Sequence, residues 1–397
     1  MGGVPVKQEE AGLYLHVPFC RHHCGYCGFA VTEKGAADRA LQRQYVEAML
    51  RELEMRLRWH PGLAFTTLYI GGGTPSILAE TELRFLFSEL GHLIDFAHLR
   101  EITFEANPED LLARPELPPL LRELGATRLS VGLQTLSPQG LEALERRARP
   151  EAILELSRAL PRSFAGDVCY DFILGWPGQT REAFAARDLR FLREATYHHL
   201  SIYFLNYEPG TRLERDRRLG RVKPLPEDHQ VDIWESWIAA AAERGLHHYE
   251  ISSFARSGHE SLHNRNTWRG RPYLGAGAGA VSRVGQVRWT NLRHPPGYLK
   301  KVAAQRFPAW QAEFLTPEIR WKEDLMLSLR WKQGIDPTSF AARHGFEPLR
   351  GMEKKLAEWK KNGWLAQDSG RLRLTPAGWL LADEIITDWM ARLETKP

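Results

Sequence analysis

The sequence has little cysteine, no strong excess of charge of either sign and no long apolar run. Four cysteines in 397 residues exclude a disulfide framework. The 53 Lys and Arg residues nearly balance 49 Asp and Glu. The resulting net charge of +4 is too small to argue for nucleic acid as a partner, and we expect none, but it is compatible with an anionic small molecule. No apolar run approaches the ~18 residues of a membrane helix, and Met1–Pro5 does not resemble a signal peptide. We therefore expect a cytoplasmic protein without a membrane span, for which peripheral membrane contact stays open.

Three of the four cysteines stand within eight residues, directly after the strand-like residues 13–17. They are Cys20, Cys24 and Cys27. Cytosolic thiols stay reduced and three cannot pair, so disulfides are a poor explanation. An iron–sulfur cubane needs soft thiolate ligands, and three cysteines leave one iron open for chemistry. The alternative is a zinc site, with His22 or His23 as the fourth ligand.

Six short apolar runs alternate with helical patterns, which is typical of βα units that build a parallel sheet. The apolar runs are residues 13–17, 66–70, 101–105, 127–132, 168–174 and 199–205. The expected helices are residues 39–59, 79–93, 109–123, 138–161, 181–195 and 227–244. Polar residues and glycines follow the strands, where βα barrels build their sites. We expect an α/β fold with a partial (β/α)6 barrel and its closing extension over residues 1–312.

The pattern changes from residue 313 onward. Helices are expected at residues 317–332, 337–344 and 348–362, a hairpin at 364–374 and a last helix from Thr375. This order predicts a winged-helix-like α+β module over residues 313–397. The third helix is basic and would suit a DNA-reading wing. We favour a solvated face instead, because the overall charge is nearly balanced.

A glycine-rich turn, Gly71 to Pro75, follows the second strand and precedes a helix. Glycines there let the backbone approach a ligand where side chains would collide. No Gly-Lys-Ser/Thr follows, so this is not a phosphate-binding Walker loop. Alone it would indicate a tight turn as readily as a ligand cradle. Beside the cysteine triplet one strand earlier, it favours the cradle.

Four further polar residues are expected at the same rim of the barrel. They are Glu105, Gln134, Arg146 and Asp171. Carboxylates and an amide can bind hydroxyl groups and a base, while the guanidinium of Arg146 offers a bidentate grip on an anion. Each residue alone would more ordinarily be a surface cap or an ion pair.

The C-x3-C-x2-C spacing, with Tyr26 before the third cysteine, resembles the radical S-adenosylmethionine (SAM) signature. Motifs along nearly the whole chain are similar to those of the oxygen-independent coproporphyrinogen III oxidase family of radical SAM proteins. The matching segments are residues 14–20, 71–75, 105–108, 130–134, 171–178 and 249–253, with the tail. The resemblance implies that Cys20, Cys24 and Cys27 hold a [4Fe-4S] cluster. It also implies a SAM pocket formed by Tyr14, Tyr26, Gly72, Gly73, Thr74, Glu105, Gln134, Arg146 and Asp171.

Two departures separate this chain from the oxidase of that family. Phe29 stands where the oxidase has a further cysteine, and only 13 residues precede Tyr14, where the oxidase has a longer extension. Both departures resemble the family's haem chaperone branch, which binds haem and hands it to haem-requiring proteins. The resemblance implies haem as cargo, with haem-acceptor proteins and an electron donor as partners. The alternatives are oxidative decarboxylation of coproporphyrinogen III, which Phe29 argues against, and a radical SAM haem-opening methyltransferase.

Residues 263–268 resemble the haem motif His-Asn-x-x-Tyr-Trp of the chaperone branch, with Thr267 in place of tyrosine. Imidazole is a common axial ligand of haem iron, and an adjacent aromatic can pack on the macrocycle. His263 is therefore the candidate haem ligand, although a lone histidine is more often structural. We expect Cys169, inside a predicted strand, to be a small core residue. The sequence does not indicate an oligomeric state.

Overall fold

A curved sheet of 12 strands organises the larger part of the molecule. The computed structural model describes residues 8–394, so Met1–Pro5 and the expected domain limits at residues 1 and 397 lie outside the described residues. The first six strands lie side by side in sequence order, all parallel. They are β1 (Glu9–Val17), β2 (Leu63–Gly72), β3 (Glu101–Ala106), β4 (Arg128–Gln134), β5 (Asp167–Leu174) and β6 (His199–Phe204). These strands match the six expected apolar runs and confirm the expected α/β fold with a parallel sheet.

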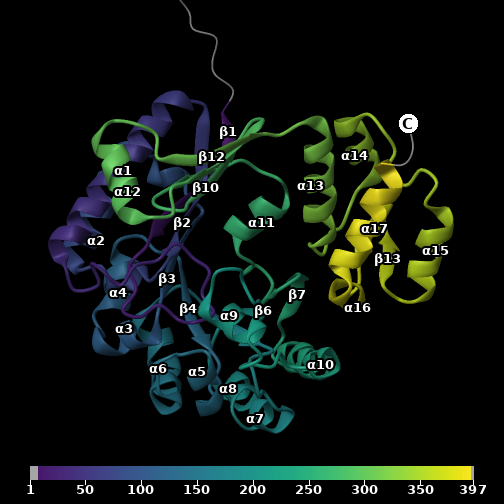
Figure 1. Cartoon of the computed structure of the whole chain (residues 1–397), viewed down its shortest axis with the longest axis horizontal. Helices are drawn as coiled ribbons and strands as arrows, with labels where there is room; N and C mark the ends of the chain where they lie inside the picture. Colours follow the sequence, from purple (N-terminus) through teal and green to yellow (C-terminus); the bar gives the residue numbers. More distant parts are fainter. Residues whose placement is uncertain (1–7, 395–397) are drawn as a thin grey trace, which may run out of the picture.

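Helices cover the outer side of this sheet (Figure 1). The crossover helices include α1 (Arg39–Trp59), α2 (Glu80–Leu93), α6 (Pro150–Ser163), α8 (Asp188–Glu194) and α10 (Glu227–Glu243). Asp38 fixes the start of α1, because its side chain accepts a hydrogen bond from the amide of Leu41. Apolar residues of the strands and of the inner helix faces form one large buried core. Within residues 8–394, no helix combines the length and the apolar character needed to cross a bilayer.

Three of the expected long helices are each divided into two. Proline explains two of the divisions: residues 109–123 become α3 (Pro108–Ala113) and α4 (Leu117–Glu123), and α6 begins afresh at Pro150 after α5 (Pro138–Ala143). The residue before a proline avoids the helical conformation, so Pro115 separates α3 from α4, and Pro150 favours a new helix start after α5 has ended near Glu145, which has a φ of +54°. The third division lies at Arg187, whose φ of −122° separates α7 (Arg181–Ala186) from α8.

Six further strands extend the parallel barrel at both edges. β9 (Tyr273–Ala276) pairs parallel with β1, and β8 (Ser253–Ala255) pairs antiparallel with β6. Beyond them lie β10 (Val281–Val284), β11 (Val287–Asn291), β12 (Ala309–Phe314) and β7 (His247–Glu250). These strands are three to six residues long. They form the closing extension expected before residue 312, but their individual positions were not predicted.

The C-terminal part forms a second hydrophobic core beside the barrel (Figure 1). Its elements are α13 (Pro317–Leu329), α14 (Pro337–His344), α15 (Glu353–Lys361), the hairpin β13 (Leu365–Asp368) and β14 (Arg371–Leu374), α16 (Pro376–Leu380) and α17 (Ala382–Glu394). This order matches the expected winged-helix-like module. The expected boundary after residue 312 falls inside β12, and the division at that point stays a prediction.

The module docks on strand β7 through backbone hydrogen bonds. The amide of Ile251 donates to the carbonyl of Arg330 at 3.0 Å, and that of Lys332 donates to the carbonyl of Tyr249 at 2.9 Å. The indole of Trp379 meets the ring of His248 edge-on at 4.3 Å. Polar and aromatic contacts therefore join the tail to the edge of the barrel sheet.

Asp188, at the start of α8, is a buried carboxyl group whose pKa can be tested through the stability of the protein. Its carboxylate accepts hydrogen bonds from the amide of Leu136 at 2.6 Å and from the hydroxyl of Thr135. Burial raises the pKa of Asp188 from 3.8 to about 7. Between these values the folded chain binds a proton that the unfolded chain has lost, so the free energy of unfolding falls as pH rises.

We predict that Asp188→Asn removes this slope. From pH 5 to pH 7, the unfolding free energy of the parent should fall relative to the variant by on the order of 1 kcal/mol per pH unit. Chemical denaturation followed by circular dichroism at several pH values measures it. Asp188→Ala, which leaves the amide of Leu136 unsatisfied, should cost about 1–3 kcal/mol. Parallel pH profiles for the parent and Asp188→Asn would contradict the assignment.

Candidate functional site

The three clustered cysteines lie in the loop that follows β1, at the carboxyl end of the parallel strands. Backbone hydrogen bonds shape the loop: the amide of Cys20 donates to Thr32 at 3.0 Å, and that of Cys27 to Cys24 at 3.1 Å. All three thiols are free and partly buried. Burial raises the pKa of Cys20 to about 12 and also raises that of Cys27. Without a metal the thiols of Cys20 and Cys27 are protonated, so metal binding must displace their protons.

The spacing of the thiols bears on which metal they suit. Two sulfur ligands on one zinc ion, each about 2.3 Å from it, cannot be more than about 4.6 Å apart. The described residues contain one group of three metal-ligating side chains whose ligand atoms all lie within 4.8 Å of one another, and it includes no cysteine. His22 lies beside Glu33 and Glu145, and His23 bonds to the carbonyl of Cys27. The thiols therefore suit a larger cluster better than a single zinc ion.

The glycine loop after β2 lies directly against the cysteine loop. The amide of Gly73 donates to the carbonyl of Val17, and that of Thr74 to the carbonyl of Phe19, both at 2.8 Å. A Cβ at Gly73 would lie 2.8 to 3.0 Å from the backbone of residues 18–19. The hydroxyl of Thr74 is 3.5 Å from the sulfur of Cys20. The cysteine motif and the glycine motif, which follow successive strands in the sequence, are thus in contact. This contact is required if both motifs bind one ligand.

Glu105, on β3, connects the glycine loop to the barrel interior. Its carboxylate accepts hydrogen bonds from the hydroxyl of Tyr69 at 2.7 Å and from the amide of Gly72 at 2.9 Å. Gly72 has a φ of +113°, a conformation that favours glycine. Burial raises the pKa of Glu105 to about 6. A carboxylate held in this way can accept further hydrogen bonds from ligand hydroxyls.

Arg146 lies on the cysteine side of the rim, in the loop after α5. Its guanidinium donates to the side chain of Asn107 and to the carbonyl of Gly132, both at 2.9 Å, while its Nε has no hydrogen-bond partner among the described residues. Partial burial raises the pKa of Tyr26, and the nearby Arg146 cation opposes that shift. Gln134 ends β4 with a φ of +70°. Arg146 therefore has one buried donor left for an anion.

Asp171, on β5, belongs to a buried polar network that sequence reasoning missed. Its carboxylate accepts from the hydroxyl of Ser130 at 2.8 Å and from the thiol of Cys169 at 3.4 Å. The sulfur of Cys169 lies 2.9 Å from Nδ1 of His199, whose Nε2 lies 2.8 Å from the hydroxyl of Tyr249. Cys169 is buried as expected, but it faces polar neighbours and is not part of the apolar core. The alternation of a strand, which puts residues 169 and 171 on one face, was the available signal.

His263 lines a cavity of about 490 Å³, which Tyr14 and Glu105 of the expected SAM pocket also line. The other lining residues include Tyr14, Phe29, Tyr69, Glu105, Thr267, Tyr273 and Arg293. Nδ1 of His263 is 2.9 Å from the hydroxyl of Thr67, and Nε2 has no hydrogen-bond partner among the described residues. Burial lowers the pKa of His263 to about 4, so the ring is neutral at pH 7 and can donate a lone pair. Trp268, the aromatic of the motif, packs instead near Trp331 of the C-terminal module.

The elements around His263 fix its position. It lies in α11 (Leu262–Trp268), and the carboxylate of Glu101 accepts hydrogen bonds from the amides of Leu262 and His263 at 2.8 and 2.9 Å. On the other side, a Cβ at Gly12 would lie 3.0 Å from the imidazole. The imidazole of His263 is therefore held between the start of α11 and strand β1, where Gly12 leaves room for the ring.

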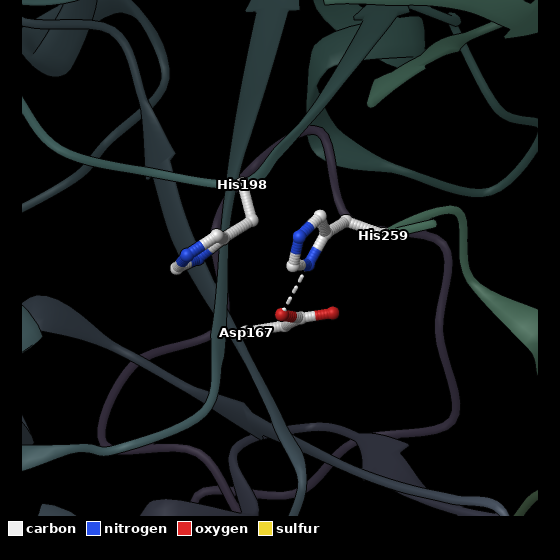
Figure 2. A group of neighbouring side chains, drawn as sticks. All are labelled: Asp167, His198 and His259. Atoms are coloured by element: carbon white, nitrogen blue, oxygen red, sulfur yellow. Dashed lines mark hydrogen bonds and ion pairs between the residues drawn. The ribbon is translucent and has the colours of Figure 1, made fainter. Parts of the chain in front are cut away.

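A second group of metal-ligating side chains, Asp167, His198 and His259, lies close together (Figure 2). It is at the ends of the strands opposite to the cysteines. Asp167 begins β5, His198 precedes β6 and His259 follows β8. Asp167 already binds His259 at 2.6 Å and Arg128 at 3.1 Å, and Nδ1 of His198 accepts from the amide of residue 168. The two imidazoles stack with planes 30° apart, so their lone pairs do not converge. The group therefore acts as a structural link between strand ends.

Comparisons with known proteins identify the family of this chain. Residues 14–189 match the model of the radical SAM superfamily, and residues 315–381 match that of the HemN C-terminal domain. Heme chaperone HemW of Mycobacterium tuberculosis is 33% identical over 389 residues, covering 97% of this chain and 96% of that protein. Heme chaperone HemW of Bacillus subtilis is 31% identical, covering 96% and 99%. The chain belongs to the HemW family of radical SAM proteins.

A solved structure agrees with the fold of this HemW family member. Coproporphyrinogen III oxidase (HemN) from Escherichia coli superposes with a TM-score of 0.81 and 24% sequence identity, covering 96% of this chain and 90% of that one. At this identity the likeness shows the fold alone. Membership of the radical SAM superfamily implies a [4Fe-4S] cluster and SAM as cofactors. The three free thiols and the glycine cradle beside them fit these two groups.

The contact between the two loops yields a stability prediction. We expect Gly73→Ala to lower the free energy of unfolding by about 1–3 kcal/mol, because the new Cβ would overlap the backbone after β1. Gly91, in the exposed part of α2, has nothing within 4 Å of an added Cβ. Gly91→Ala is thus a matched control and should raise stability by about 0.5–1 kcal/mol. Equal effects of the two substitutions in chemical denaturation would show that the loops do not pack as described.

Proposed function

We propose that this chain is a haem chaperone, which holds haem together with a [4Fe-4S] cluster and SAM and delivers the haem to acceptor proteins. The observation that carries the proposal is the cavity in which a neutral imidazole, His263, has an uncommitted ring nitrogen among aromatic side chains. The relatives in Mycobacterium tuberculosis and Bacillus subtilis are both heme chaperone HemW, which supports this cargo. A protein electron donor is the further partner.

The cavity has the groups that a haem needs. An imidazole lone pair can bind the iron axially, and aromatic faces can pack against the macrocycle. The aromatic residues of the cavity are Tyr14, Phe29, Tyr69 and Tyr273. Arg293 lines the same cavity and supplies a cation for a haem carboxylate. These residues replace Trp268 as the aromatic partners of the cargo.

We assign the cluster to Cys20, Cys24 and Cys27, because these thiols are the soft ligands at the mouth of the barrel. When bound, the cluster supplies one-electron chemistry beside an iron that no protein group occupies. The SAM pocket is assigned to residues at or near the carboxyl ends of the first five strands. These are Tyr14, Tyr26, Gly72, Gly73, Thr74, Glu105, Gln134, Arg146 and Asp171. Arg146 holds an anion there, while Glu105 and Asp171 accept hydrogen bonds from hydroxyl groups.

The oxidase alternative is disfavoured by Phe29. Its side chain is 66% exposed and lines the His263 cavity, where a thiol would be available for chemistry. A phenyl ring can neither bind a metal nor exchange electrons under physiological conditions. The structure offers no observation that favours the haem-opening methyltransferase.

The cluster assignment predicts the iron content of variants. Anaerobically reconstituted parent protein should carry iron and acid-labile sulfide and absorb broadly in the visible range. Cys20→Ala/Cys24→Ala/Cys27→Ala should lose both, because three soft ligands are removed together. Cys169→Ala serves as the control and should keep the full complement. Full iron content in the triple variant would refute the assignment.

The cargo assignment predicts haem binding without oxidase turnover. The parent should bind haem stoichiometrically with a shifted Soret band, and His263→Ala should alter that spectrum, because an axial ligand is removed. His92→Ala, on the exposed side of α2, is the control and should leave the spectrum unchanged. With cluster, SAM and a reductant present, coproporphyrinogen III should not be converted. Formation of protoporphyrinogen would favour the oxidase instead.

A further inference from the structure

A strongly basic surface lies next to the cysteine loop. Between residues 212 and 223, six basic residues face two acidic ones, a local net charge of +4, which equals that of the whole chain. The basic side chains are all exposed, and we call them the α9 basic face: Arg212, Arg215, Arg217, Arg218, Arg221 and Lys223. Most of them lie on helix α9 (Arg212–Arg218). This short stretch is therefore far more basic than the chain as a whole, in which Lys and Arg nearly balance Asp and Glu.

The α9 basic face is attached to the cysteine loop itself. The amide of Leu213 donates to the carbonyl of Gly25 at 2.9 Å, and Arg212 forms an ion pair with Glu145. A cavity of about 480 Å³ lies between the two segments. Its lining includes Cys24 and Cys27 on one side and Arg212, Arg215 and Arg218 on the other. It shares no lining residue with the cavity of His263. Two of the proposed cluster ligands thus face a basic recess that the cargo cavity does not reach.

The positive charge of this face is only partly neutralised. Glu214 pairs with Arg218 at 2.8 Å, and Asp216 pairs with Arg221 at 3.1 Å. Arg215 has no side-chain partner among the described residues. Solvent-exposed ion pairs contribute little binding energy, and the excess of arginine leaves a field that attracts anions. Leu219, with 57% of its surface exposed, adds an apolar contact next to the charges.

We propose that the α9 basic face docks an acidic electron-carrier protein of low reduction potential. The proposal rests on the cluster of the proposed function. It adds the surface through which an electron reaches that cluster. Complementary charge speeds the encounter of two proteins and sets their orientation. Docking there brings the carrier against the loop of Cys24 and Cys27, so the electron need not cross the barrel core. One electron leaves the carrier, which is oxidised by one equivalent, and the cluster is reduced by one; no bond forms or breaks.

The experiment reverses two charges of the face in the full-length reconstituted protein. Arg215→Glu/Arg218→Glu and the parent are mixed anaerobically with photoreduced flavodoxin, an acidic flavin carrier used as the probe, and cluster reduction is followed by stopped-flow absorbance. The second-order rate constant should fall about tenfold or more at low salt, and the difference should shrink as salt screens the charges. Reduction by dithionite, a small reductant that needs no docking surface, should still reach completion in both proteins.

The matched control is Arg51→Glu/Lys300→Glu, which changes the net charge equally on exposed positions of α1 and α12 (Pro295–Ala303), away from α9 (Figure 1). It should react with flavodoxin at nearly the parent rate. A parent rate for the α9 variant, with dithionite reduction intact, would overturn the docking surface alone. A parent protein that dithionite cannot reduce would overturn the cluster and the proposed function. Loss of binding to anionic phosphatidylserine vesicles in the α9 variant, with flavodoxin reduction unchanged, would assign the face to a membrane and overturn the proposal.

Discussion

The close approach of two backbone segments at the mouth of the barrel is the contact on which the site depends. The amides of Gly73 and Thr74, after β2, donate hydrogen bonds to the carbonyls of Val17 and Phe19 at the end of β1. The two backbones are so close that a side chain at Gly73 would not fit between them. Because parallel neighbours end at the same edge of a sheet, the fold brings these loops together, but glycine lets them touch. The contact sets the thiol of Cys20 beside the hydroxyl of Thr74 and holds Gly72 where its amide meets Glu105. The cysteine loop, the glycine loop and Glu105 are therefore held together by direct contacts.

Acidic groups inside the barrel have a physical cost that the fold only partly offsets. Burial raises the pKa of both Glu105 and Asp171, although hydrogen-bond donors stabilise the charged form of each. A ligand that brings hydroxyl groups or a positive charge into this interior would provide further stabilisation. The partly satisfied acids therefore favour the binding of a polar molecule over the filling of the barrel with apolar side chains. This distinguishes the interior from a packed structural core, although the surrounding strands are apolar on their outer faces.

The sequence predicts the parts of this protein that repeat a local pattern. Six strands, helix α1 and the elements of the tail could be predicted from periodicity and helix caps. The contact between the cysteine and glycine motifs then follows, because each motif comes after one of two neighbouring parallel strands. Long-range packing was not predictable in this way. The added strands are short, so their patterns are weak. Trp268 turns toward Trp331 of the tail, and Cys169 meets His199 from the neighbouring strand; both depend on contacts between distant segments. The resemblance to the family supplied His263, which no spacing rule would have selected.

The segment of residues 22–30 borders both cavities, and this arrangement separates two tasks. Its first half, with Cys24 and Cys27, lines the basic recess, while Phe29 and Ala30 line the cavity of His263. Electrons that enter from the α9 side would reach the thiols without passing the cargo, and cargo in the other cavity would meet Phe29 rather than a cysteine. Phe29 would thus give the proposed cargo an apolar neighbour two residues from Cys27, although the rest of the cavity includes Glu105 and Arg293. The same short loop can therefore hold a redox centre and shield a bound haem from it, because its two halves face different cavities.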